Sequence, residues 1–74
     1  MTTEQRHDEI QRLESRLAFV RRGFLRIADE LHDANNLLLS SELSRVLDQL
    51  NVQRRQLSAE YRLLVGRLQE LKAA

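Results

Sequence analysis

The sequence contains no cysteine and no proline, and among its 74 residues it has only two glycines and three aromatic side chains. The absence of cysteine excludes disulfide bonds and thiolate metal ligands. The absence of proline means that no residue forces a helix to break. Leucine, arginine, glutamate, glutamine and alanine are abundant, and all five are good helix formers. We therefore expect an all-α protein.

Long apolar segments and a strong net charge are missing as well. Apolar residues occur only in short runs, such as residues 37–39, whereas a membrane span needs roughly 18. Residues 1–5 are polar and lack the apolar region of a signal peptide. The formal net charge is +1, which is too balanced for a general polyanion-binding protein. These features favour a cytoplasmic protein with no membrane contact.

Residues with catalytic or metal-binding chemistry are few and scattered. The two histidines, His7 and His32, lie 25 residues apart, and neither has a histidine partner four residues away. Ser40, Ser41 and Ser44 have no base at the spacing of a catalytic pair. We expect no metal, no other cofactor and no enzymatic activity.

The first half of the chain is organised by a regular apolar pattern. Seven apolar residues recur at alternating steps of three and four: Ile10, Leu13, Leu17, Val20, Phe24, Ile27 and Leu31. This is the a/d pattern of a heptad repeat, which places all seven side chains on one stripe of a helix. A single helix in water cannot bury such a stripe, so the pattern predicts a helical partner.

A second pattern, out of phase with the first, organises the other half. Its apolar positions are Leu43, Leu47, Leu50, Leu57, Tyr61, Leu64, Leu68 and Leu71, with Arg54 at the one polar position. The change of phase falls in residues 32–41, where Asn35-Asn36 favours a turn and Ser40-Ser41 favours a helix start. The sequence thus predicts one domain, residues 1–74, built as an antiparallel hairpin of helices at about 4–33 and 41–72. The alternative is one continuous helix with a stutter.

Further apolar residues widen the stripe on both predicted helices. They are Ala18, Phe19, Leu25, Ala28, Val46, Leu63 and Val65. A wide stripe suits a helix with two neighbours. We therefore expect a homodimer that forms a four-helix bundle, since two-fold pairing is the commonest assembly, or docking on the apolar surface of a larger protein. Gly23 is either a tolerated surface glycine or the point where another helix approaches closely.

Arginines gather in the middle of the predicted hairpin. A fold about position 37 sets residue i near residue 74 − i and brings together Arg21, Arg22, Arg26, Arg54 and Arg55. Only Arg26 has an acidic residue four positions away, Glu30. The cluster is a solvated face, or Arg54 fixes the register of the seam, or the arginines bind an acidic partner or a nucleic-acid backbone. The scarcity of aromatic residues for base stacking argues against nucleic acid.

Residues 26–38 read Arg-Ile-Ala-Asp-Glu-Leu-His-Asp-Ala-Asn-Asn-Leu-Leu. This run resembles the phosphoacceptor segment in the dimerisation helix of sensor histidine kinases. The resemblance implies that His32 is a phosphorylated imidazole, that Asp33 orients it or takes its proton, and that Asn36 positions a water for dephosphorylation. It implies a phosphotransfer or phosphatase-like element of a two-component system.

Two other runs resemble the small bacterial SlyX proteins, which are short coiled-coil chains. They are Leu-Glu-Ser-Arg-Leu-Ala-Phe at residues 13–19 and Tyr-Arg-Leu-Leu at residues 61–64. Residues 20–23 depart from the glutamine-rich middle of that family, and the family implies no established activity. Taken together, the patterns favour a non-enzymatic module for protein interaction and oligomerisation, acting as an adaptor, a regulator or an assembly subunit.

Overall fold

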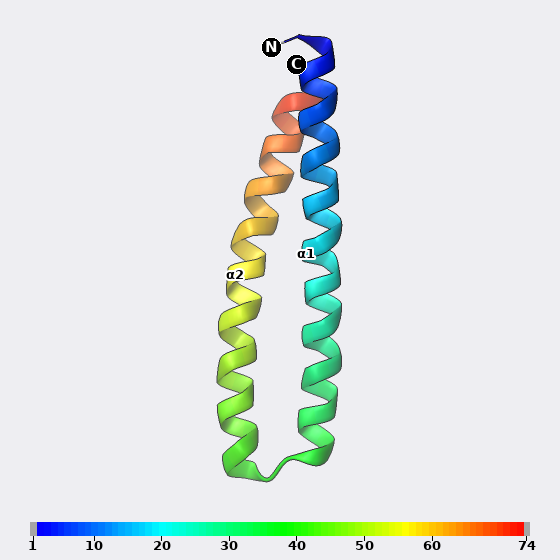
Figure 1. Cartoon of the computed structure of the whole chain (residues 1–74). Coiled ribbons are helices and arrows are strands. Elements are labelled where there is room, and N and C mark those ends of the chain that lie inside the picture. Colours follow the sequence, from blue (N-terminus) through cyan, green and yellow to red (C-terminus); the bar gives the residue numbers. More distant parts are fainter. Residues whose placement is uncertain (1, 74) are drawn as a thin grey trace.

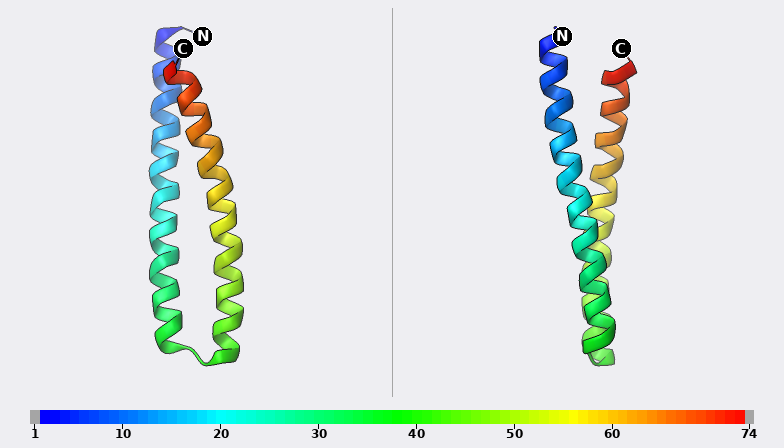
Figure 2. Two further views of the ribbon diagram at one scale, coloured as in Figure 1. Left: turned by 180° about the vertical axis from the view of Figure 1, so that it is seen from behind. Right: turned by 90° about the vertical axis from the view of Figure 1, so that its right-hand side faces the viewer.

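The computed structural model describes residues 2–73, which form two antiparallel helices (Figure 1). Helix α1 spans Thr3–Leu37 and helix α2 spans Ser40–Ala73. The helices run side by side in a rod of 55 × 15 × 13 Å, with both ends of the chain at the same end of the rod (Figure 2). The predicted all-α hairpin is confirmed, and the alternative of one continuous helix is wrong.

Helix α1 begins with a capping box formed by Thr2 and Gln5. The Gln5 backbone N–H donates to the Thr2 hydroxyl at 3.1 Å, and the Gln5 side chain accepts from the Thr2 backbone N–H at 3.0 Å. These bonds satisfy donors that the first turn of a helix leaves without a partner.

The turn is shorter than predicted and lies later in the chain. α1 continues four residues past the predicted end at residue 33, so that only Leu38 and Leu39 separate the helices. The Asn36 side chain donates to the His32 carbonyl oxygen at 2.9 Å, and Ala34 is 5% exposed in the seam between the helices. No non-glycine residue in the described chain has a positive φ. The turn predicted at the asparagines is wrong because burial of Ala34 outweighs the turn preference of asparagine.

The core is a single narrow seam. Its buried residues are Leu17, Val20, Ile27, Ala34, Leu50, Leu68 and Leu71. All of them occupy predicted a/d positions, except Ala34, which extends the first pattern. The Phe24 and Tyr61 rings also meet within the seam, edge to face, with centroids 6.3 Å apart.

Three ion pairs across the hairpin define its register: Arg16 with Glu60, Glu9 with Arg67, and Glu14 with Lys72. The first two lie on one side of the seam, at heptad position g of both helices, and the third lies on the other side, at position e. We call these sides the g flank and the e flank. The two residue numbers of a pair total 76 on the g flank and 86 on the e flank. Midway between the flanks, residue i of α1 therefore lies level with about residue 81 − i of α2. The predicted relation, 74 − i, is wrong by about one heptad.

The two helical glycines sit in different surroundings. A Cβ added to Gly23 would lie 2.9 Å from Leu57 Cδ1, whereas a Cβ added to Gly66 would meet nothing within 4 Å. Gly23 thus marks a close approach of α2, which was one of the two interpretations of this residue. Gly66 carries no such packing role.

This contrast predicts different changes in the free energy of unfolding for alanine substitutions at the two glycines. Gly66→Ala should raise the free energy of unfolding by about 1 kcal/mol, because alanine is the better helix former. Gly23→Ala should gain clearly less or destabilise the hairpin, because Leu57 must move aside. Urea unfolding followed by circular dichroism measures both, and an equal gain at the two positions would contradict the close approach at Gly23.

Candidate interaction surface

In the half of the rod near the chain ends, charged side chains bridge the two helices on the g flank. They stand beside a groove of about 590 Å³ lined by Glu9, Arg12, Leu13, Arg16 and Leu64. The Arg16 guanidinium donates two hydrogen bonds to the Glu60 carboxylate, the longer at 3.1 Å. The same guanidinium lies over the Phe19 ring, 4.5 Å from its centroid. The hydrogen bonds from Arg16 lower the pKa of Glu60 below its ordinary value and raise the pKa of Arg16.

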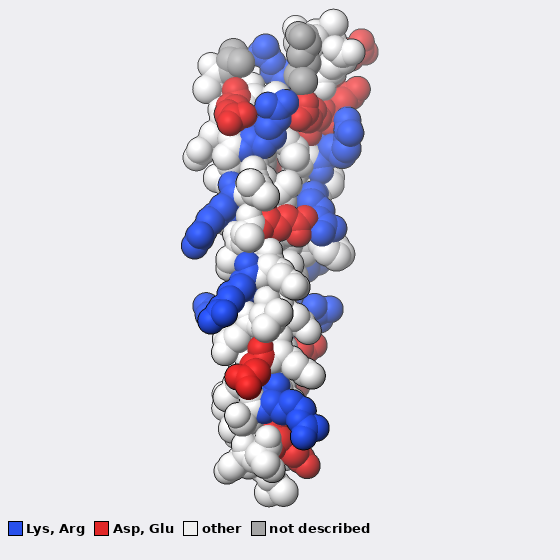
Figure 3. Space-filling view, turned by 90° about the vertical axis from the view of Figure 1, so that its left-hand side faces the viewer, with Lys and Arg blue, Asp and Glu red and all other residues white. Residues whose placement is uncertain are grey.

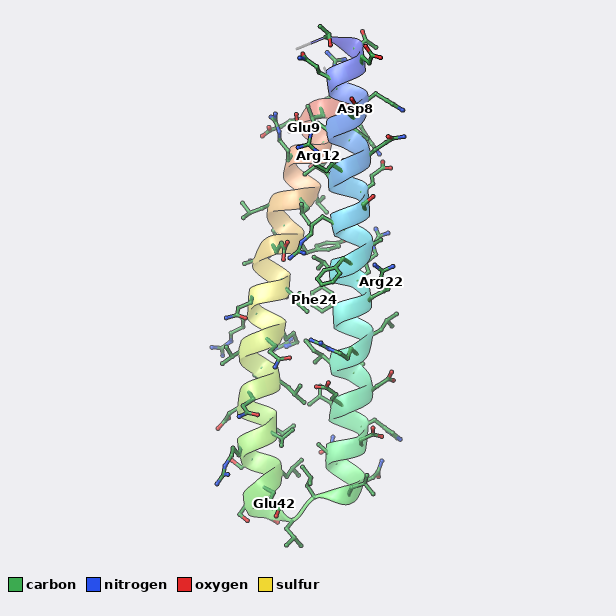
Figure 4. The ribbon with its side chains drawn as sticks, viewed as in Figure 1. Asp8, Glu9, Arg12, Arg22, Phe24 and Glu42 are labelled. Carbon is green, nitrogen blue, oxygen red and sulfur yellow. The ribbon has the colours of Figure 1, made fainter. Side chains whose placement is uncertain are left out.

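Two further cations extend this charged region toward the ends of the chain. Arg67 binds Glu9 of α1 at 3.0 Å and Glu70 of its own helix at 3.2 Å, and these hydrogen bonds raise the pKa of Arg67. On the e flank, Lys72 lies 3.0 Å from Glu14. Figure 4 shows Glu9 and Arg12 projecting from α1 toward α2 in this half.

The half near the turn has no comparable pairs. Within the described chain, the only ion pair between residues 17 and 59 joins Arg26 to Glu30 in the same helix, at 3.9 Å. Apolar side chains are exposed there instead, with Leu37 at 79% and Leu39 at 73%. Figure 3 shows uncharged atoms covering the tip of the rod at the turn. This half therefore presents surface that the hairpin itself does not cover.

Two grooves follow each other along the g flank in this half. The first, of about 180 Å³, is lined by Phe19, Arg22, Gly23, Arg26 and Leu57. The second, of about 270 Å³ and next to the turn, is lined by Glu30, Asp33, Ala34, Leu37, Leu38 and Val46. Each groove has an apolar floor, but the first is edged by two arginines and the second by two carboxylates.

The predicted arginine belt is divided among three places. Arg22 and Arg26 edge the first groove of the g flank, and Figure 4 shows Arg22 on the side of α1 away from α2. Arg21 lines a groove on the e flank. Arg54 and Arg55 line a third groove, of about 330 Å³, on α2. The structure therefore does not gather the five arginines on one surface, and Arg54, although at a seam position, is exposed.

The predicted phosphoacceptor residues lie close to the turn. His32 is exposed, and its ring Nε2 is 3.3 Å from the Asn36 side-chain nitrogen one helical turn later. That amide also donates to the His32 carbonyl oxygen. Asp33 lines the second groove of the g flank, and no hydrogen bond joins it to His32 in residues 2–73. The helix thus brings His32 together with Asn36 but not with Asp33.

Comparison of the chain with models of protein families, with curated proteins and with solved structures gives no match. In residues 2–73, no three histidine, cysteine or acidic side chains come together as a metal site. Neither described helix combines the length and the apolar character required to cross a membrane. Arguments about function therefore start from the surface of the hairpin.

Sequence reasoning missed the two grooves of the g flank. Most of their lining residues on α1 are exposed, and each of these alone is an ordinary surface residue of a helix. The available signal was spacing, because six of them occupy heptad positions c and g on one side of the seam: Phe19, Gly23, Arg26, Glu30, Asp33 and Leu37. Only the register of α2, which adds Leu57 and Val46, shows that this stripe borders two hollows.

The lowered pKa of Glu60 predicts an acid-sensitive contribution to stability. A carboxylate with a lowered pKa in the folded state stabilises the fold at neutral pH, and this contribution is lost as the pH falls through that pKa. Wild type should therefore be more stable than Glu60→Gln at neutral pH, and the difference should shrink below about pH 4.3. Thermal unfolding across pH measures this difference. Asp29→Asn, which removes an acid without an ion pair, should show little such pH dependence; equal behaviour of both variants would contradict the assignment.

Proposed function

We propose that the chain is a non-enzymatic module for protein interaction and oligomerisation, and that it pairs with a second copy to form a four-helix bundle. The observation that supports this proposal is the large apolar surface that two helices leave uncovered. The exposed large apolar side chains are Phe19, Leu25, Leu37, Leu39, Val52 and Leu63. These six exposed residues are as many as the large apolar residues that are buried in the seam.

The total surface of the hairpin supports the same proposal. A compact monomer of 8.7 kDa exposes about 4,700 Å². This chain exposes 5833 Å², a surplus of about 1,100 Å². A standard protein interface buries roughly 800 Å² on each partner. One face-to-face contact with a second hairpin would therefore remove most of this surplus.

Sedimentation equilibrium of the full chain tests this function. We expect the mass of two chains at micromolar concentration, together with a melting temperature that rises with protein concentration, because association stabilises the folded state. A fully helical monomer over the whole concentration range would contradict the proposal.

A second candidate function is phosphotransfer through His32, and one contact supports it. The resemblance to histidine kinases implies that Asn36 acts beside the phosphorylated imidazole, and the Asn36 amide lies 3.3 Å from His32 Nε2 on an exposed side of α1. A neutral, exposed imidazole nitrogen is a competent phosphoryl acceptor. On this alternative the hairpin would relay phosphate between other proteins.

Incubation with a phosphorylated response regulator separates the two candidates. If His32 is the acceptor, radioactive phosphate should label wild type and the control variant His7→Ala but not His32→Ala. Asn36→Ala should keep the label longer, because the residue implied to position a water is gone. Absence of label on wild type, or its persistence in His32→Ala, would exclude His32 as the acceptor.

A further inference from the structure

Helix α1 carries a second stripe beside the apolar seam. It consists of Phe19, Gly23, Arg26, Glu30, Asp33 and Leu37, at steps of four and three residues. These residues occupy heptad positions c and g, and all of them line the two grooves of the g flank. We call this set the c/g stripe.

The c/g stripe is complementary to itself when it is reversed. Two copies of α1 that run antiparallel, with a two-fold axis at the level of residue 28, set Phe19 opposite Leu37 and Arg26 opposite Glu30. Gly23 then faces Asp33. The apolar ends of one stripe meet the apolar ends of the other, and the central charges meet opposite charges.

The surface properties of these residues fit such a contact. Leu37 is 79% exposed and Phe19 is 51% exposed, so both have apolar surface to bury. The Arg26–Glu30 pair within one helix is long, at 3.9 Å, and both side chains are exposed. Arg22, which edges the same groove as Gly23, makes no ion pair in the described chain and lies where it can meet the carboxylate of Asp33 from a second copy.

Helix α2 has no charged residue at positions c and g at the level of the axis, so its g flank does not repel a second copy there. Its residues at positions c and g there are Gln49, Gln53 and Gln56, and all three are exposed. Glutamines can hydrogen-bond to one another across a two-fold axis. The e flank has no comparable alternation of opposite charges with apolar ends.

We propose that two copies pack through their g flanks, with turns pointing in opposite directions, so that Arg26 of each copy binds Glu30 of the other. This inference rests on the proposed self-association and specifies its face, its direction and its register. The arginine-edged groove of each copy then covers the carboxylate-edged groove of its partner.

Charge reversal at the centre of the stripe tests the proposal. In the antiparallel pair, Arg26→Glu sets two carboxylates against each other, and Glu30→Arg sets two arginines against each other. Each single variant should weaken self-association about tenfold or more, because opposed like charges are costly at an interface. Sedimentation of the full chain measures the dissociation constant, and circular dichroism confirms that each variant stays helical.

A mixture of the two variants is the decisive measurement. An Arg26→Glu copy and a Glu30→Arg copy oppose unlike charges at both contacts, so the mixed dimer should regain the wild-type affinity. The ion pair within α1 cannot explain this recovery, because it is broken in both chains. The double variant with both substitutions should also pair with itself as wild type does.

Failures of this inference and of the proposed function are distinguishable. A wild-type chain that stays monomeric, or that binds only to a larger protein, overturns both. Single variants that dimerise as tightly as wild type, or a mixture that does not recover, overturn the g-flank contact and leave self-association standing.

Replacing one of two exposed leucines by serine gives an independent measurement. Leu37→Ser removes an exposed side chain of the c/g stripe, and Leu25→Ser removes one that is 67% exposed on the other side of the same helix. Neither residue belongs to the seam, so the hairpin itself should survive both changes. Leu37→Ser should weaken the dimer several-fold more than Leu25→Ser, and the reverse order would overturn the assignment of the face.

Discussion

The structure depends on the burial of one apolar seam between two helices of almost equal length. A lone helix with this sequence would leave its leucines in water, whereas burying a leucine or isoleucine side chain contributes about 1.5–3 kcal/mol. The seam continues through Ala34, and for that reason α1 stays helical past its asparagines and the chain turns only at Leu38 and Leu39. Because the seam is narrow, each helix keeps two flanks that the hairpin does not cover.

Charge divides these flanks into two halves with different properties. Near the ends of the chain, ion pairs bridge the two helices on both sides of the seam: Arg16 with Glu60, Glu9 with Arg67, and Glu14 with Lys72. Near the turn, in the described chain, the flanks bear exposed leucines and two grooves with edges of opposite charge. The first half is thus tied together by ion pairs within one chain, although a groove remains on each of its flanks. In the second half, a second chain can cover the exposed leucines and pair with the charged edges of the grooves.

The sequence predicts the helices and the seam well but the turn and the register poorly. The spacing of apolar residues identifies the buried positions because a helix repeats its faces regularly. It cannot choose between registers that differ by seven residues, since a shift of one heptad returns every a and d position to the seam. The turn was misplaced because Asn35 and Asn36 favour turns locally, while packing of Ala34 acts over a longer range. The grooves were missed because they depend on that register.

The ion pairs resolve the ambiguity that the seam leaves. In a hairpin shifted by one heptad, Arg16 would face Gln53, and Glu9 would face Glu60 as a like charge. Exposed ion pairs contribute only about 0–1 kcal/mol each, so their importance here lies in selecting one register among several that bury the seam equally. The half near the turn has no ion pair between the two helices in the described chain. Its charges are therefore available for recognition, which is why we locate the interaction surface there.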